Sequence, residues 1–230
     1  MSKIYGLFKK IFLPYDKEVL DKFIIGKLQN IQSGKSILDL GCGSQQYRKH
    51  CKHLEYYGQD FGQSTDGTGD EKINYSYGDL DYVGNCWDVD EQEGKFDVIL
   101  CTEVFEHIPY PELTLSEINR LLKKDGKLII TFPVFSLRHM DPYWFSPGYS
   151  DNWVKFFFDK YDFEIVDYEK YGDYTTFMNQ EMIRVIASNK FASLFIIPVL
   201  VYFRFFYSNS KSSMRNLIFM GNHIEAVKKS

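Results

Sequence analysis

The stretch "SILDLGCG", residues 36–43, constrains the fold of this chain more than any other. An apolar run that contains Asp39 ends at Leu40, and Gly41 and Gly43 follow at once. A short, nearly continuous apolar run is typical of a strand buried on both faces of a parallel sheet. Glycine has no Cβ, so the two glycines let the backbone turn sharply and approach a ligand closely. The stretch therefore predicts a buried strand whose carboxyl end meets a ligand.

Six further segments of strand character follow along the chain, over residues 55–60, 73–79, 96–102, 127–133, 163–171 and 223–229. Two helices are predicted from apolar residues at helical spacing: one over 16–31, and one that begins near Pro111 and ends at Gly126. Strands that alternate with helices form a parallel sheet covered on both faces. We therefore expect an α/β protein with a three-layer, doubly wound, mostly parallel seven-stranded sheet.

The composition fits one ordinary globular domain and excludes some functions. The chain has 230 residues, 44% of them hydrophobic, and a net charge of −4. This charge argues against sequence-independent binding of nucleic acid, which needs a basic surface. Four cysteines without a CxxC pattern and an N-terminus without a signal peptide favour a reducing cytoplasm. His50 and His53 read as one polar helix face rather than a metal site.

The charges at the carboxyl ends of the first strands indicate the type of ligand. Asp60 ends the second strand, where a carboxylate holds ribose hydroxyls in nucleotide-binding proteins. A nicotinamide dinucleotide needs a third small residue three positions after the second glycine, and Gln46 stands there. Asp39 at the mouth of the glycine turn would repel a pyrophosphate. S-adenosylmethionine has an ammonium group, a sulfonium and a ribose but no phosphate, so the charges favour this cofactor.

With these residues in hand, the chain resembles the class I, seven-stranded S-adenosylmethionine-dependent methyltransferases over roughly residues 30–170. The resemblance rests on "LDLGCG", "YYGQD", "GDLD", "FDVILCTEVFEHIP" and "INRLLKKDGKLIITFP". Within this superfamily the chain is similar to bacterial enzymes encoded among cell-surface polysaccharide genes, through Tyr47 and "HMDPYWFSPGY". It departs from them at Gln45, where many relatives have a third loop glycine, and in lacking the arginine that often follows the tryptophan.

The resemblance implies how the domain is arranged. It predicts a closing antiparallel strand and one methyltransferase domain over residues 1–230. This domain would comprise an N-terminal helical segment (1–32), a cofactor-binding core (33–171), an apolar helical insertion between strands six and seven (172–220) and a final strand (221–230). No metal is needed for methyl transfer from a sulfonium, and we expect none.

The resemblance also implies a set of cofactor-binding residues at the carboxyl ends of the first four strands. The residues of the glycine turn would surround the methionine part of the cofactor, and those that end strand two would bind its ribose and adenine. The residues after strand three would contact the edge of the adenine, and those after strand four would form the floor of the methyl-transfer site. Simpler explanations remain for Asp79 as a turn residue, Asp60 as a helix cap and Phe61 as core. The set is Asp39, Gly41, Cys42, Gly43, Asp60, Phe61, Asp79, Leu80, Thr102 and Glu103.

Two histidines follow strands four and five and are the candidates for proton removal from an acceptor hydroxyl. His107 acts as that base or only orients its loop. His139 is the second candidate, with Asp141 as its partner. Tyr143 and Trp144 either stack on a sugar ring or serve as ordinary packing residues.

The segment "FASLFIIPVLVYFRFFY", residues 191–207, is too short and, with Pro198, too broken for a transmembrane helix. It is a lid, a contact with an anionic membrane, a buried pair of helices or a homodimer interface. Basic residues nearby (Lys190, Arg204, Lys211 and Arg215) would favour anionic headgroups at the inner face of the membrane.

We therefore expect a cytoplasmic, membrane-associated methyltransferase that O-methylates a sugar or glycolipid intermediate of cell-surface polysaccharide biosynthesis. Two alternatives stay open: a small lipid, quinone or aromatic metabolite as acceptor, or a cofactor-binding homologue without catalysis.

Overall fold

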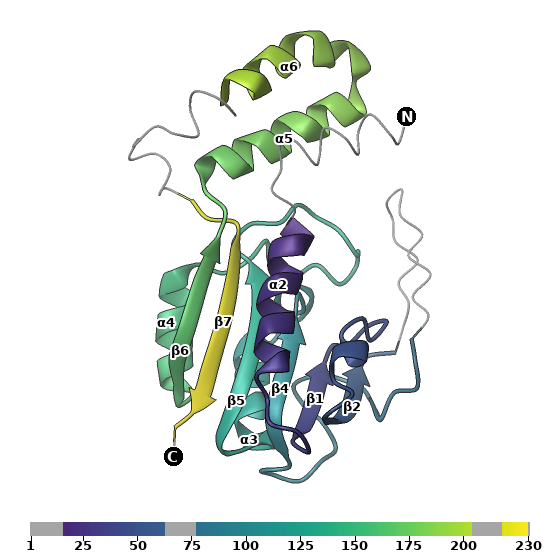
Figure 1. Cartoon of the computed structure of the whole chain (residues 1–230), viewed down its shortest axis with the longest axis vertical. Coiled ribbons are helices and arrows are strands. Elements are labelled where there is room, and N and C mark those ends of the chain that lie inside the picture. Colours follow the sequence, from purple (N-terminus) through teal and green to yellow (C-terminus); the bar gives the residue numbers. More distant parts are fainter. Residues whose placement is uncertain (1–15, 63–76, 204–217, 230) are drawn as a thin grey trace. The chain divides into compact units, whose positions relative to one another are not determined.

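The centre of the protein is a seven-stranded sheet (Figure 1). The computed structural model describes residues 16–62, 77–203 and 218–229. The strands lie in the order β3-β2-β1-β4-β5-β7-β6. Their bounds are β1 Ser36–Leu40, β2 Glu55–Asp60, β3 Tyr82–Val83, β4 Phe96–Thr102, β5 Leu122–Pro133, β6 Phe163–Tyr171 and β7 Gly221–Lys228.

Helices precede the sheet and connect several of its strands. The α-helices are α2 Asp16–Gln29, α3 Pro111–Leu121, α4 Asp151–Lys160, α5 Tyr174–Ser188 and α6 Ser193–Tyr202. Short 3-10 helices are η1 Arg48–His50, η2 Phe105–His107 and η3 Lys190–Ala192. The helix predicted over 16–31 is confirmed as α2. Only η1 connects β1 to β2, so the glycine turn after β1 does not lead into an α-helix.

The sheet is parallel except at β7. Strands β3, β2, β1, β4 and β5 pair in parallel. At the two ends of the β6–β7 pair, the amide of Met220 donates to the carbonyl of Tyr171 and the amide of Lys229 donates to the carbonyl of Asp162. These bonds require β7 to run antiparallel to β6. The expected α/β fold with a closing antiparallel strand is confirmed.

Apolar residues on both faces of the strands produce the three layers. Leu38 and Leu40 of β1 pack with Leu115 of α3 and Phe158 of α4 in the main core. Ile37, which points to the opposite face, is equally buried. On that face, Lys27 of α2 forms ion pairs with carboxylates of β6 and β7. Figure 1 shows α2 and α4 on opposite sides of the sheet.

The third strand does not lie where the sequence predicts it. Of the predicted range 73–79, residues 73–76 lie outside the described part of the chain, and 77–79 are not in a strand. The carboxylate of Asp81 instead accepts the amide of Gly58 at 2.8 Å. The amide of Asp81 also donates to the carbonyl of Gly58 at 2.9 Å. The residue pairing of β3 with β2 follows directly, with Tyr82 opposite Gln59.

The fifth strand begins earlier than predicted. Leu122 has helical spacing in the sequence, but it is extended, completely buried and paired with Phe96. Burial against β4 therefore outweighs its helix propensity. A bulge follows before Val98 pairs with Lys127, so Gly126 lies within the strand and does not end a helix.

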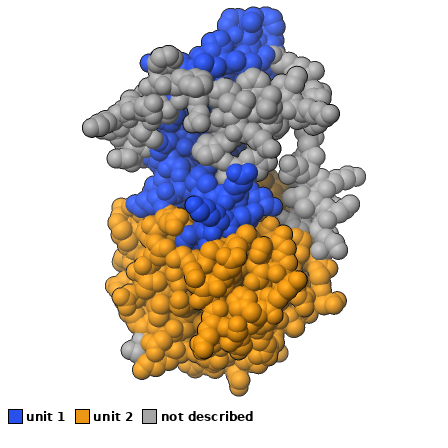
Figure 2. Space-filling view, in the orientation of Figure 1, with its two compact units in different colours: residues 1–23, 170–221 blue, residues 24–169, 222–230 orange. Residues whose placement is uncertain are grey.

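The chain divides into two compact units, residues 1–23 with 170–221 and residues 24–169 with 222–230, which Figure 2 shows in different colours. In the first unit, α5 and α6 pack through Ile183 and Leu200, while Phe191, Leu194 and Phe195 are exposed. None of the described helices has the length and apolar character needed to cross a bilayer. Residues 1–15 of the predicted N-terminal helical segment lie outside the described residues.

Candidate active site

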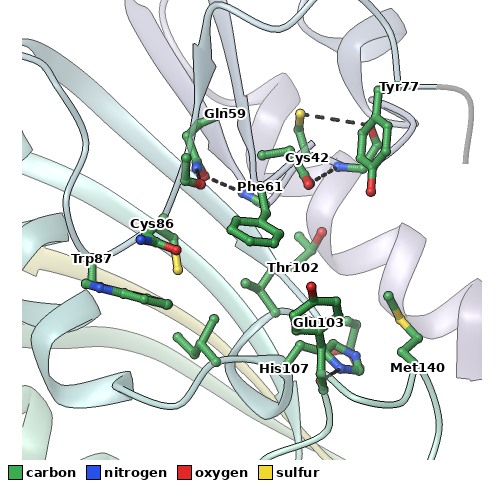
Figure 3. Close-up of a pocket in the computed structure, with 18 of the residues that line it drawn as sticks. Cys42, Gln59, Phe61, Tyr77, Cys86, Trp87, Thr102, Glu103, His107 and Met140 are labelled. Carbon is green, nitrogen blue, oxygen red and sulfur yellow. Dashed lines mark hydrogen bonds between the residues drawn. The ribbon is translucent and has the colours of Figure 1, made fainter. Parts of the chain in front are cut away.

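A cavity of about 450 Å³ lies at the carboxyl ends of the parallel strands, all within the second unit. Ligands bind at this edge in open α/β sheets. Figure 3 shows its lining, with Trp87 on one side and Met140 on the other. The lining comes from the last residues of β2 and β4 and from the segments that follow β1, β2, β3, β4 and β5: Gly41, Cys42, Gly43, Ser44, Gln46, Gln59, Asp60, Phe61, Tyr77, Gly84, Asn85, Cys86, Trp87, Thr102, Glu103, Val104, His107, Ile108, Pro109, Met140, Tyr143 and Phe145.

The glycine turn after β1 is held in a conformation that a larger residue would disturb. Gly41 has a φ of +72°, and a Cβ there would lie 2.5 Å from a methyl group of Val104. Its amide donates to the carbonyl of Gln59 at 2.9 Å. The amide of Gly43 donates to the carboxylate of Asp60 at 2.8 Å. The turn therefore presents main-chain atoms without side chains at Gly41 and Gly43, and its hydrogen bonds fix it to the end of β2.

The charges around the cavity are negative. Asp60 and Glu103 contribute carboxylates, and none of the described lining residues is a lysine or arginine. Burial lowers the pKa of His107 to about 4, so its imidazole is neutral near pH 7. Among the described lining residues a pyrophosphate would meet no lysine or arginine, whereas a sulfonium or ammonium group meets favourable carboxylates. The cavity thus suits a cationic ligand without phosphate.

Asp39 lies behind the glycine turn and is not among the residues that line the cavity. Its side chain is 2% exposed and accepts a hydrogen bond from the Tyr56 hydroxyl at 2.7 Å. Burial raises the pKa of Asp39 to about 7, although the bond from Tyr56 opposes this rise. Asp39, expected at the mouth of the turn, is therefore buried against Tyr56, whereas Asp60 and Glu103 line the cavity.

The segment around β3 differs most from the expected site. Asp79 is exposed, its carbonyl accepts from the Gln45 amide at 2.9 Å, and neither Asp79 nor Leu80 lines the cavity. Because the third strand lies later in the chain than predicted, Asn85 and Trp87 reach the cavity in their place. Sequence reasoning missed these residues, and Gln59 also, because "GNCWD" contains no familiar motif; the correct bounds of β3 would have indicated them.

The two candidate histidines lie together beside a buried carboxylate. The rings of His107 and His139 are 4.7 Å apart between centroids. Glu106 is 2% exposed, and its Oε1 lies 3.6 Å from Nε2 of His107. Burial, assisted by the charge of Glu103, raises the pKa of Glu106. Asp141, the expected partner of His139, accepts two hydrogen bonds from Arg138.

The segment that follows β5 brings aromatic side chains over the loop that follows β4. The amide of Phe145 donates to the carbonyl of Glu106 at 2.9 Å, which fixes this segment to η2. Tyr143 and Phe145 line the cavity, and the Tyr143 ring lies 5.7 Å from that of Phe61. Trp144 donates to the Ser136 hydroxyl and does not line the cavity. Of the expected stacking pair, only Tyr143 is in a position to touch a ligand.

The geometry agrees with the comparisons. A family profile described as a methyltransferase domain matches residues 13–164, which is more than half of the chain. The chain belongs to this family. Its cofactor is S-adenosylmethionine. The cavity suits this cofactor, which is cationic and has no phosphate, because the described lining contains carboxylates and no lysine or arginine. Gly41, Gly43 and Asp60 would hold it.

Named relatives of this methyltransferase are distant. It is 29% identical over 105 residues to the ubiquinone biosynthesis O-methyltransferase of Coxiella burnetii (strain Dugway 5J108-111), covering 43% of each chain. It is 24% identical over 146 residues to the demethylmenaquinone methyltransferase of Bacillus pumilus, covering 56% of this chain and 62% of the other. It thus spans less than half the length of the first relative.

The fold also matches a solved structure over nearly the whole chain. A SAM dependent methyltransferase from Archaeoglobus fulgidus superposes with a TM-score of 0.57 at 18% identity, covering 97% of this chain and 99% of the other. At this identity the likeness supports the fold alone.

Proposed function

We propose that this methyltransferase O-methylates a hydroxyl group on a small aromatic ring, of the phenol or quinol class. The observation that carries the proposal is the character of the cavity beside His107. There the described lining is mostly apolar or aromatic, with Ile108, Met140, Tyr143 and Phe145 around the histidine. Such walls bury a flat ring and exclude water from the reacting atoms.

The two ends of the cavity would have different roles. The glycine turn, Asp60 and Phe61 form the cofactor end, and Asn85 and Trp87 continue it beyond β3. The acceptor would enter at the other end, between the loop that follows β4 and the segment that contains Met140. Glu103 follows β4 and also lines the cavity, with a φ of +52°.

Within this arrangement the chain positions the acceptor and removes its proton. When bound, S-adenosylmethionine supplies an electrophilic methyl group. Nδ1 of His107 bonds the carbonyl of Tyr143 at 2.7 Å, and a carbonyl can only accept, so the proton sits on Nδ1. Nε2 therefore keeps its lone pair, and the neutral imidazole can take the proton of a hydroxyl group as its oxygen is methylated.

Two considerations favour an aromatic acceptor over the sugar that the sequence resemblance suggested. A sugar ring presents several hydroxyl groups that need hydrogen-bonding partners, and the acceptor end of the cavity offers mainly apolar surface. The named relatives include enzymes of ubiquinone and menaquinone methylation. Their similarity covers only part of each protein, so it supports the class of acceptor without specifying the compound.

Transfer of a labelled methyl group tests the proposal. The purified chain is incubated with labelled S-adenosylmethionine and either simple dihydroxylated aromatics or monosaccharides and their nucleotide conjugates. We expect labelled aromatic ethers. His107→Ala should lower kcat at least about a hundredfold, the usual effect of losing a general base.

The matched control is His50→Ala, which removes a histidine of η1 outside the cavity and should keep the activity of the parent. Methylation of the sugars with none of the aromatics would refute the proposed acceptor and support surface-glycan methylation.

A further inference from the structure

The cluster of Glu106, His107 and His139 contains a buried carboxylate oxygen that lacks a hydrogen-bond partner. Oε2 of Glu106 is completely buried, and no described residue donates a hydrogen bond to it. One ligand-type atom from each of the three side chains lies within 4.8 Å of the other two. A buried carboxylate oxygen without a donor is costly, so such a group usually has a cation or proton beside it.

The two histidines are both fixed in the tautomer that cannot satisfy this carboxylate. Nδ1 of His107 bonds the carbonyl of Tyr143 at 2.7 Å, and Nδ1 of His139 bonds the carbonyl of Leu137 at 2.8 Å. Each Nδ1 therefore donates to a carbonyl, which leaves Nε2 as the ring nitrogen that can bind an ion. A backbone carbonyl that orients the outer nitrogen of a histidine is the usual support of a metal-ligating imidazole.

We propose that Glu106, His107 and His139 bind a divalent transition-metal ion at the wall of the cavity. Two imidazole nitrogens and one carboxylate oxygen form a donor set that suits ions such as Zn²⁺, Mn²⁺ or Co²⁺. Ligand atoms around such an ion lie about 3–3.5 Å apart, so the cluster must contract slightly on binding. His139 is exposed and can make this movement.

The ion would promote ionisation of the acceptor hydroxyl, and this role rests on the proposed function. His107 lines the cavity, so an ion on its Nε2 lies at the acceptor end. A hydroxyl oxygen that displaces a water from the ion acquires a lower pKa and releases its proton to solvent. His107 is then a ligand, and the ion replaces it in promoting ionisation of the hydroxyl. This differs from the expectation that no metal takes part.

Titration of the full, chelator-treated chain with Co²⁺ tests the site directly, because cobalt bound by nitrogen and oxygen ligands absorbs visible light. We expect one Co²⁺ per chain, displaced by Zn²⁺. His139→Ala and Glu106→Gln should each weaken binding at least tenfold. His139 is exposed, so its replacement should leave the fold intact; binding of S-adenosylhomocysteine, unchanged within about twofold, checks this for both variants.

His50→Ala is the matched control, because it removes a histidine outside the cluster and should bind Co²⁺ like the parent. The inference is overturned if the parent binds no Co²⁺, or if the two cluster variants bind it as tightly as the parent. Failure of the metal site with continued methylation of an aromatic hydroxyl would leave the proposed function standing. Cobalt binding without methylation would reject the function and keep the site.

Discussion

At the scale of single residues, the two carboxylates predicted near the glycine turn have different tasks. Asp60 holds the amide of Gly43 and lines the cavity. Asp39 is buried and accepts a hydrogen bond from the Tyr56 hydroxyl. A carboxylate in that position destabilises the ligand-free protein whenever it is ionised, because its charge has lost most of its hydration. Selection for the fold alone would not favour an aspartate there.

We therefore predict that Asp39→Asn stabilises the cofactor-free protein in a pH-dependent manner. The folded-state pKa of Asp39 is raised from 3.8 to about 7, so the folded protein holds this proton more tightly than the unfolded chain. The stabilisation from this group is complete below about pH 4 and is lost as the pH rises through 7. The variant should gain up to about 4 kcal/mol over the parent at pH 8 and much less at pH 5.

Urea denaturation of both proteins at pH 5 and pH 8 measures this difference. Tyr56→Phe is the informative companion, because it removes the hydrogen bond that favours the ionised carboxylate and should destabilise the protein more at pH 8 than at pH 5. An equal effect of Asp39→Asn at both pH values would show that the carboxyl group does not titrate as described.

At the scale of elements, the loop that follows β1 is fixed by a residue that appeared unsuited to it. Gln45 stands where the sequence resemblance leads one to expect a third glycine, and it adopts a φ of +57° that glycine tolerates best. Its side chain compensates for this strain by two bonds. Nε2 donates to the carbonyl of Asp79 at 2.9 Å, and Oε1 accepts from Arg48 at 2.7 Å. The glutamine thus joins the glycine loop to the segment before β3.

Two substitutions at Gln45 separate the strain from the bonds. Gln45→Ala loses both hydrogen bonds and keeps the left-handed backbone, whereas Gln45→Gly loses the bonds but relieves the backbone. We expect the glycine variant to be more stable than the alanine variant by about 1 kcal/mol, the usual cost of this conformation for a residue with a Cβ. Chemical denaturation checks the order, and an alanine variant at least as stable as the glycine variant would contradict it.

At the scale of the whole molecule, the sequence predicted the elements whose signals are local and strong. Strands β1, β2, β4 and β6 have the predicted bounds, since each is a segment of strand character that ends in polar or glycine-rich sequence. Strand β3 was misplaced because its bonds to β2 begin at Asp81, whose amide donates to the carbonyl of Gly58 and whose carboxylate accepts the amide of Gly58. No local pattern marks this point. The start of β5 was misplaced because burial of Leu122 against β4 overrides its helical spacing.

The same distinction explains which parts of the site the sequence could predict. Gly41, Gly43 and Asp60 were predicted because their motif has a backbone meaning, and the structure brings them to the cavity together with Thr102, Glu103 and His107. Asn85 and Trp87 were missed because their place depends on the register of β3. The proximity of His139 to Glu106 depends on the path of the segment after β5, which no local pattern specifies.

We infer that the cavity beside Asp60 is the site that binds S-adenosylmethionine. Calorimetric titration of the whole chain with this cofactor tests it most directly, with Asp60→Ala and the matched variant Asp90→Asn, an exposed aspartate outside the cavity. We expect one cofactor per chain for the parent and unchanged affinity for Asp90→Asn. Asp60→Ala should bind at least tenfold more weakly, because the hydrogen-bond acceptor for the ligand and the bond to the Gly43 amide are both lost. Equal affinity of Asp60→Ala and the parent, or no binding by the parent, would contradict it.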